Sequence, residues 1–151
     1  MTIYLGAVTA RGGRSKASAA ASLTWEYVER ASRYTAVESI HFSDERSLFT
    51  WVDKGKGRTD CFVILLDSAG QQHSSEEIAS VLTKLRDDGK QRVLLAIGPA
   101  SGWSEDSRKR ANLLLSLGRI TLPHELAAVV LAEQIYRALT IIAGHPYHCG
   151  H

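Results

Sequence analysis

The sequence predicts an α/β fold, in which one domain is built on a mostly parallel sheet of five to six strands. Short apolar runs alternate with helix-like stretches, and short connections join them, as in the βα units of a parallel sheet. Two of the runs, residues 61–66 and 93–97, are apolar throughout, as strands covered on both faces are. A chain of 151 residues is long enough for one buried core, so we expect a single domain over residues 1–151.

The expected elements follow one another in strict βα order. The apolar runs predict strands at Ile3–Val8, Val37–Phe42, Cys61–Asp67, Arg92–Gly98 and Gly118–Pro123. The stretches between and after them predict helices at Lys16–Ser32, Asp44–Val52, Ser75–Asp88, Glu105–Leu115 and His124–Ala143. The glycine- and lysine-containing stretch Asp53–Asp60 is expected to be a loop, for which a solvated connection is the simplest interpretation.

Two of these helices carry recognisable start signals. Ser74 and Glu77 have the spacing of a capping box, in which each side chain accepts a hydrogen bond from the other residue's backbone N–H. Ser104 precedes Glu105 and Asp106, so acidic side chains lie at the positive end of the helix dipole.

Composition narrows the class of function. Hydrophobic residues make up 44% and charged residues 23% of the chain, as in an ordinary globular protein. The formal net charge is only +2, so an RNA substrate would need a local basic patch rather than the field of the whole protein. The two cysteines, Cys61 and Cys149, match no zinc or redox spacing. No signal peptide, membrane span or lipidation motif is recognisable, so we expect a cytoplasmic protein without a membrane partner.

The last thirty residues hold the strongest candidates for chemistry. Glu133 and Arg137 lie four residues apart on an expected helix that is otherwise apolar almost all round. An ion pair at this spacing is often only a surface pair, but a helix of this kind must be buried or lie at an interface. Dimerisation through this helix is the natural inference. His145, His148, Cys149 and His151 cluster at the chain end, but they lack the second half of any known zinc spacing, so we expect no metal.

Two further candidates follow expected strands. Gly98 and Gly102 lie in a strand-to-helix turn, where glycine allows close backbone approach to a ligand but also serves any tight turn. The third glycine and the ribose-binding acid of a dinucleotide site are missing. Asp67 follows the strand that begins at Cys61, and capping of the next turn is its favoured role over ligand binding.

The pattern LPHxLxxVxLxEQxYRAxxIxxxHPYH over residues 122–148 resembles the C-terminal signature of the RlmH-type ribosomal RNA methyltransferases, members of the knotted SPOUT class. Residues 27–34 are similar to that family's YxxRxxRY helix, and residues 66–77 to its LDxxGxxxSSEE stretch. The resemblance implies a homodimer with a C-terminal trefoil knot that uses S-adenosyl-L-methionine to methylate N3 of a pseudouridine in large-subunit (23S) rRNA, within the assembled ribosome.

The resemblance also implies roles for particular residues. The cofactor would contact Leu66, Gly98, Leu117, Gly118, Arg119, Ile120, Thr121 and Leu122. The catalytic candidates are His124, Arg137, Tyr147 and His148. Among these, Arg137 would contact a phosphate or base oxygen, Tyr147 would stack or use its hydroxyl, and His148 would handle the proton, with the tail of one subunit completing the site of the other. His124, at a helix start, has a structural role as its alternative.

The chain departs from the family pattern at two places. Pro99 stands where the family has a second glycine, and proline removes a backbone N–H and fixes φ. The chain ends in Cys149-Gly150-His151 instead of a basic residue, which removes a cation that could neutralise phosphate. Candidate replacements are Arg11, Arg14, Lys16, Lys54, Lys56 and Arg58. A knotted methyltransferase with another RNA substrate, and a catalytically lapsed dimeric module that binds RNA or the ribosome, stay open as alternatives.

Overall fold

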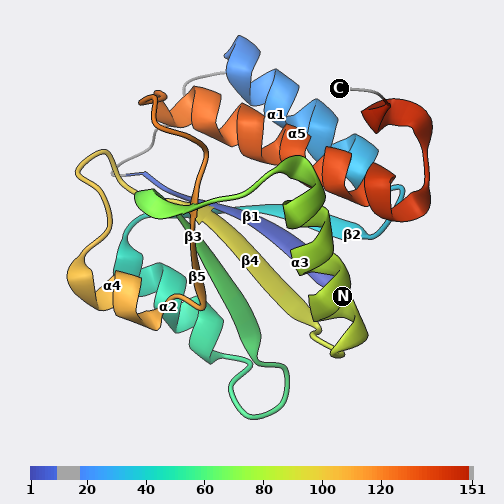
Figure 1. Cartoon of the computed structure of the whole chain (residues 1–151). Helices are drawn as coiled ribbons and strands as arrows, with labels where there is room; N and C mark the ends of the chain where they lie inside the picture. The colour runs from blue at the N-terminus through green and yellow to red at the C-terminus, as the bar shows by residue number, and fades with distance from the viewer. Residues whose placement is uncertain (10–17, 150–151) are drawn as a thin grey trace.

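The structure, a computed structural model, describes residues 1–9 and 18–149 and confirms the α/β class (Figure 1). Within these residues the sheet has five strands in the order β2-β1-β4-β3-β5, and every pairing is parallel. The strands are β1 (Thr2–Val8), β2 (Ala36–Phe42), β3 (Cys61–Gln72), β4 (Arg92–Ile97) and β5 (Leu113–Ser116). The helices are α1 (Ala19–Ala31), α2 (Glu45–Asp53), α3 (Ser75–Asp87), α4 (Glu105–Arg110) and α5 (His124–Ala143), followed by a 3₁₀ turn, η1 (Pro146–His148).

Helices cover both faces of the sheet, which divides the core in two (Figure 1). On one face α1, α3 and α5 pack over one set of alternating strand residues, such as Val93 and Leu95 of β4. On the other face α2 and the segment before α4 pack over the intervening residues, such as Leu94 and Ala96. Both sets are almost fully buried, which is why the run at residues 93–97 is apolar throughout.

Local capping matches the sequence at the predicted helix starts. The hydroxyl of Ser74 accepts a hydrogen bond from the Glu77 N–H at 3.1 Å, and the Glu77 carboxylate accepts one from the Ser74 N–H at 2.7 Å. At the start of α4 the hydroxyl of Ser104 accepts a hydrogen bond from the Ser107 N–H at 3.2 Å. The capping box and the start of α4 are therefore confirmed.

The region between α4 and α5 differs from the prediction. The expected helix Glu105–Leu115 ends at Arg110, and the expected strand Gly118–Pro123 is wrong because residues 117–123 form an irregular loop. The fifth strand is instead the leucine run of β5, paired with β3. Asn112 starts this pairing: its N–H donates to the carbonyl of Val63 at 2.8 Å, and its side-chain oxygen accepts from the Val63 N–H at 2.8 Å. This pairing overrides the helix propensity of leucine.

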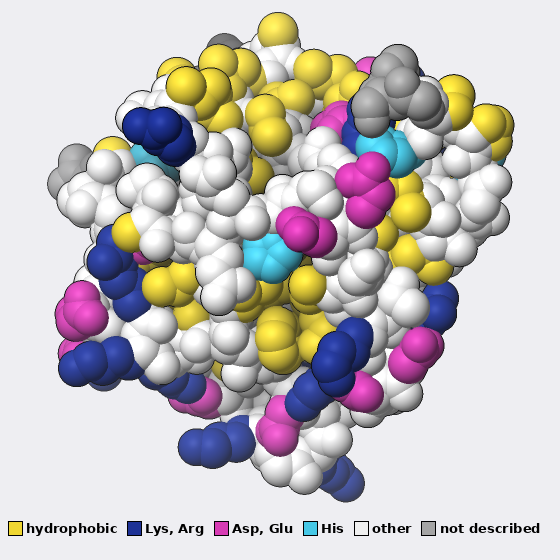
Figure 2. Space-filling model, viewed as in Figure 1, with side chains coloured by type: hydrophobic (Ala, Val, Ile, Leu, Met, Phe, Trp, Pro, Cys, Tyr) yellow, Lys and Arg dark blue, Asp and Glu magenta, His cyan; other side chains and the backbone are white. Residues whose placement is uncertain are grey.

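Helix α5 has the predicted bounds and lies between α1 and α3 (Figure 1). By length and composition alone α5 is apolar enough to cross a membrane: its mean hydropathy is 1.6, over a window of which 33% is buried. The core helix of a globular protein meets the same criterion. The large apolar side chains left exposed on α5, on the loop before it and on α1 are Leu126, Ile120, Leu23 and Trp25. Hydrophobic side chains also gather at the top of the molecule, over α1 and α5, in Figure 2. The trefoil knot implied by the resemblance stays a prediction.

The candidate basic residues fall into two groups. Lys54, Lys56 and Arg58 are exposed in the predicted loop before β3, at the amino end of the strands. Arg11, Arg14 and Lys16 lie outside the described residues.

Candidate active site

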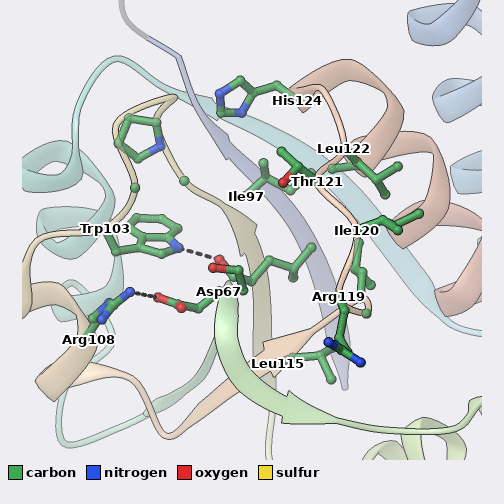
Figure 3. Close-up of a pocket in the computed structure, with 18 residues that line it drawn as sticks. Asp67, Ile97, Trp103, Arg108, Leu115, Arg119, Ile120, Thr121, Leu122 and His124 are labelled. Atoms are coloured by element: carbon green, nitrogen blue, oxygen red, sulfur yellow. Dashed lines mark hydrogen bonds and ion pairs between the residues drawn. The ribbon is translucent and has the colours of Figure 1, made fainter.

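A cavity of about 290 Å³ lies at the carboxyl ends of the strands (Figure 3). All eight residues for which the resemblance implies cofactor contact line it: Leu66, Gly98, Leu117, Gly118, Arg119, Ile120, Thr121 and Leu122. His124, at the start of α5, lines it as well. The position of the cavity agrees with the general tendency of ligands in open α/β sheets to bind beyond the carboxyl ends of the strands.

The point where the pairing of β3 with β4 ends forms two walls of the cavity. Leu66 of β3 is the register partner of Ile97 of β4, so Gly98 follows directly beside it. The chain then turns, with the Gly102 N–H donating to the Pro99 carbonyl at 2.8 Å, and reaches Trp103. This indole is 7% exposed and also lines the cavity.

Asp67 and Arg108 form an ion pair on the cavity wall, which the sequence did not reveal (Figure 3). The Asp67 side chain is 3% exposed and its Oδ2 lies 2.8 Å from Nη2 of Arg108. Oδ1 of the same carboxylate accepts from the Ala69 N–H at 2.8 Å, which is the predicted turn-capping role. Both carboxylate oxygens are therefore engaged, so Asp67 fixes Arg108 as well as the turn.

The loop before α5 forms the third wall. The Ser116 hydroxyl donates to the Gly118 carbonyl at 3.0 Å and accepts from the Gly118 N–H at 3.1 Å, which ends β5. Gly118 has φ of 123°, a conformation that other residues rarely adopt. Ile120 is 75% exposed, so this wall presents apolar surface outward as well as toward the cavity.

The remaining catalytic candidates gather at the far end of α5. Arg137 donates to Oε1 of Glu133 through Nε at 2.9 Å, and its Nη2 lies 2.8 Å from the same oxygen. The Tyr147 hydroxyl donates to that oxygen at 3.0 Å, and the Arg137 guanidinium lies 4.8 Å from the centre of the Tyr147 ring. His148 lies between Arg137 and Glu76 of α3, with Nδ1 at 3.0 Å from Arg137 and Nε2 at 2.8 Å from Glu76. We call Glu76, Glu133, Arg137, Tyr147 and His148 the tail cluster.

The contacts of His148 define its tautomer. A guanidinium has only hydrogen-bond donors, so Nδ1 of His148 is the acceptor facing Arg137. The hydrogen is therefore on Nε2, which donates to Oε1 of Glu76. A hydrogen on both ring nitrogens would set N–H against N–H at Arg137. In this arrangement the Nδ1 lone pair of His148 is occupied by Arg137 and becomes available only when Arg137 moves away.

Electrostatics in the tail cluster favour a charged arginine and a neutral tyrosine. Burial, and then the hydrogen bond to Glu133, raise the pKa of Tyr147 above its ordinary value. The hydrogen bond to Glu133 also raises the pKa of Arg137. The hydrogen bond from His148 lowers the pKa of Glu76. The cluster therefore offers a cation at Arg137 and a phenol hydroxyl at Tyr147, with the His148 ring beside them.

The cavity and the tail cluster are separate within one chain. His124 and Arg137 are thirteen residues apart on α5, and a helix rises about 1.5 Å per residue, so about 20 Å of helix separates them. The sequence treated the four catalytic candidates as one group, but the structure brings together Arg137, Tyr147 and His148 and places His124 at the cavity. Trp103, Arg108 and the carboxylate of Glu76 were not predicted as site residues, because their contacts come from distant segments.

Comparison with known proteins defines the class. The model of a family described as "Predicted SPOUT methyltransferase" matches residues 7–148. The chain belongs to this SPOUT methyltransferase family.

The names of individual relatives are more specific than the family description. Over 139 residues, 92% of this chain and 94% of the relative, the chain is 48% identical to a protein of Koribacter versatilis named "Ribosomal RNA large subunit methyltransferase H". A protein of the same name from Brucella ovis is 49% identical over 86 residues, which cover 57% of this chain and 51% of the relative.

Solved structures show the same fold at low identity. The methylase family protein of Haemophilus influenzae Rd KW20 covers 99% of this chain and 70% of its own, with TM-score 0.58 and 10% identity. The SpoU methyltransferase AviRb of Streptomyces viridochromogenes, solved in complex with AdoMet, covers 94% of this chain and 60% of its own, with TM-score 0.51 and 13% identity.

Proposed function

We propose that this protein is an S-adenosylmethionine-dependent methyltransferase that modifies N3 of a pseudouridine in large-subunit ribosomal RNA. The observation that carries the proposal is that helix α5 begins at the cavity and, further along, carries Arg137, which contacts Tyr147 and His148 of η1. The name of the Koribacter relative, which aligns over nearly its whole length, supports the rRNA substrate. A cytoplasmic location goes with that substrate.

The cavity suits an adenosyl cofactor. Its volume of about 290 Å³ is just below the roughly 300–1,000 Å³ typical of ligand sites. Leu66, Ile97 and Leu122 offer apolar surface for an adenine, while loop backbone beside Gly98 and Gly118 offers hydrogen bonds at close approach. S-adenosylmethionine bound here supplies an activated methyl group.

A second copy of the chain completes the site in this proposal. The tail cluster lies about 20 Å along α5 from the cavity, so one chain cannot bring both to the same base. Leu126 of α5 and Leu23 and Trp25 of α1 are exposed, and apolar surface on such helices favours an interface. A homodimer that covers them can bring the tail cluster of one subunit to the cavity of the other.

The tail cluster then serves the RNA. An imide nitrogen such as N3 of pseudouridine becomes a good nucleophile once it has lost its proton. Arg137 supplies a fixed cation for a phosphate or base oxygen, and the Tyr147 ring or hydroxyl contacts the base. When the base displaces Arg137 from Nδ1 of His148, that lone pair can accept the N3 proton. The contact of Nε2 with Glu76 then stabilises the ring as it becomes charged.

The first test uses labelled S-adenosylmethionine and intact ribosomes from a strain that lacks this modification. N3-methylpseudouridine in large-subunit RNA is the expected product. Cofactor binding without transfer to these ribosomes would contradict the substrate and favour another RNA. Absence of both binding and transfer would favour the lapsed binding module, and Pro99→Gly would then be the first reversion to examine.

A mixing experiment tests the shared site. Arg137→Ala damages the tail cluster, and Gly118→Val damages the cavity by forcing a branched residue into φ of 123°. Each variant alone is expected to be inactive, and mixing them under conditions that exchange subunits should restore activity through the one intact composite site. Heterodimers that form and remain inactive would contradict the shared site.

A further inference from the structure

Trp103 contacts two neighbouring backbone positions that border the cavity, Leu66 of β3 and Gly98 after β4. Its Nε1–H donates to the carbonyl of Leu66 at 2.8 Å (Figure 3). A Cβ placed on Gly98 would lie 2.7 Å from Cε2 and 2.9 Å from Nε1 of the same indole. One buried side chain thus hydrogen-bonds the backbone of β3 at Leu66, where its pairing with β4 ends, and covers the backbone just beyond the end of β4.

The need for glycine at position 98 follows from this contact. Gly98 is not among the glycines with positive φ, so its backbone conformation suits any residue. The obstacle to a larger side chain is the indole, which lies closer than real Cβ contacts allow. The glycine therefore lets the indole pack flat against the β4 end, which a turn requirement alone would not explain.

The indole is itself held in place. It belongs to the core cluster that contains Phe42, Phe49 and Leu65. On one side the Pro99–Gly102 turn leads into it, and proline fixes one backbone angle of that turn. On the other side the Ser104 N–H donates to Glu45 of α2 at 2.9 Å. Because the backbone is fixed on both sides of Trp103 and the indole is packed in the core, this side chain can hold Leu66 and Gly98 at a constant spacing.

We propose that Trp103 is a positioning residue for the methyl-donor cofactor: it sets the Leu66 carbonyl and the Gly98 backbone in the arrangement that receives the adenosyl group. This inference rests on the proposed function. A second glycine at position 99 would loosen the turn, whereas Pro99 restricts it. Proline at this position is then compatible with a cofactor loop that is rigid before binding. A preformed site binds more tightly because less order is lost on binding.

The test measures the dissociation constant of S-adenosylmethionine by calorimetry. Trp103→Phe keeps a ring but removes the N–H donor, and one hydrogen bond corresponds to roughly a five-fold loss of affinity. Trp51→Phe is the matched control, since Trp51 packs against the same core cluster but is not among the cavity-lining residues. It should leave the affinity unchanged. If Trp103→Phe changes only the melting temperature and binds like the wild type, the positioning role is wrong.

A double-mutant cycle separates positioning from general stability. Gly98→Ala should weaken cofactor binding by about ten-fold or more in the wild type, because the new methyl group displaces the indole. In a Trp103→Leu background the same change should cost less than about three-fold. Equal losses in both backgrounds would show that the indole does not transmit the effect.

Fluorescence gives a direct readout. In the Trp25→Phe/Trp51→Phe variant, Trp103 is the remaining tryptophan of the chain, and added cofactor should change its emission. If the emission of Trp103 stays constant while calorimetry shows cofactor binding, Trp103 does not border the bound cofactor and the proposed positioning role is wrong. Wild-type protein that binds no cofactor would instead refute the proposed function, so the two failures can be told apart.

Discussion

Glu133 is the residue whose charge the tail cluster depends on most, and Glu133→Gln tests this. Its Oε1 faces Nε and Nη2 of Arg137 and the hydroxyl of Tyr147, while Oε2 accepts from Gln134 at 2.6 Å. The side chains of Glu133 and Arg137 are 17% and 21% exposed. Glutamine keeps the shape and one acceptor oxygen but leaves a largely buried guanidinium without its counter-charge.

The expected loss of stability follows from these contacts. A hydrogen bond to a charged group contributes about 1.5–3 kcal/mol, and the substituted amide oxygen retains part of this. We expect Glu133→Gln to lower the free energy of unfolding by about 2 kcal/mol. For a chain of this size that corresponds to a fall in melting temperature of about 4–8 °C.

The assay is urea unfolding at one fixed protein concentration, because the stability of an oligomer depends on concentration. Asp88→Asn is the control: it removes a pair with Lys84 at the same four-residue spacing, but with side chains 53% and 77% exposed. Such a pair contributes at most about 0.5 kcal/mol. If the two variants lose the same stability, the tail cluster is not held by a shielded charge, and the role given to Glu133 is wrong.

Three further changes test other parts of the structure. Burial raises the pKa of Cys61 to about 11 against an ordinary 9.0, although the charge of Arg92 opposes this; a disulfide reagent at pH 8 should therefore label the exposed Cys149 first. In the unfolded chain Cys61 ionises at lower pH than the folded thiol, so its contribution to stability is complete below pH 9 and is lost as pH rises toward 11. The free energy of unfolding of Cys61→Ser in urea should therefore depend less on pH between 9 and 11 than that of the wild type. Ser74→Ala removes the α3 cap and should cost about 1 kcal/mol in the same assay. Asp67→Asn leaves Arg108 without its counter-charge and should cost about 1–2 kcal/mol, so an unchanged melt would contradict the ion pair.

The parts of the fold that the sequence predicted are those with local signals. Helix α5 has its predicted bounds because Pro123 precedes it and Gly144, with φ of 70°, ends it. The strands β1, β2 and β4 lie close to their predicted ranges for a similar reason, since each is a short apolar run between polar turns. The cofactor-side residues came from the resemblance, and the structure gathers them around one cavity.

The fifth strand, which was predicted at the wrong place, shows that local sequence signals do not contain information about pairing with distant segments. Leu113–Leu115 suits a helix as well as a strand, and only pairing with β3, begun by Asn112 and Val63, decides between them. That partner lies 49 residues earlier in the chain. The role of Gly98 was hidden in a similar way, because its explanation is the packing of Trp103 rather than the turn itself.

Helix α5 links the two halves of the proposed site, and its composition reflects both. The part near His124 carries exposed Leu126, whereas the part toward η1 carries the largely buried pair of Glu133 and Arg137. A helix that served only the core of one chain needs neither feature, because exposed apolar area needs a partner surface and a fixed cation beside Tyr147 needs a ligand. A second copy over the first part and an RNA at the second meet both needs. The same helix then sets the distance between the cavity and the tail cluster, which within one chain is about 20 Å and therefore too long for direct transfer.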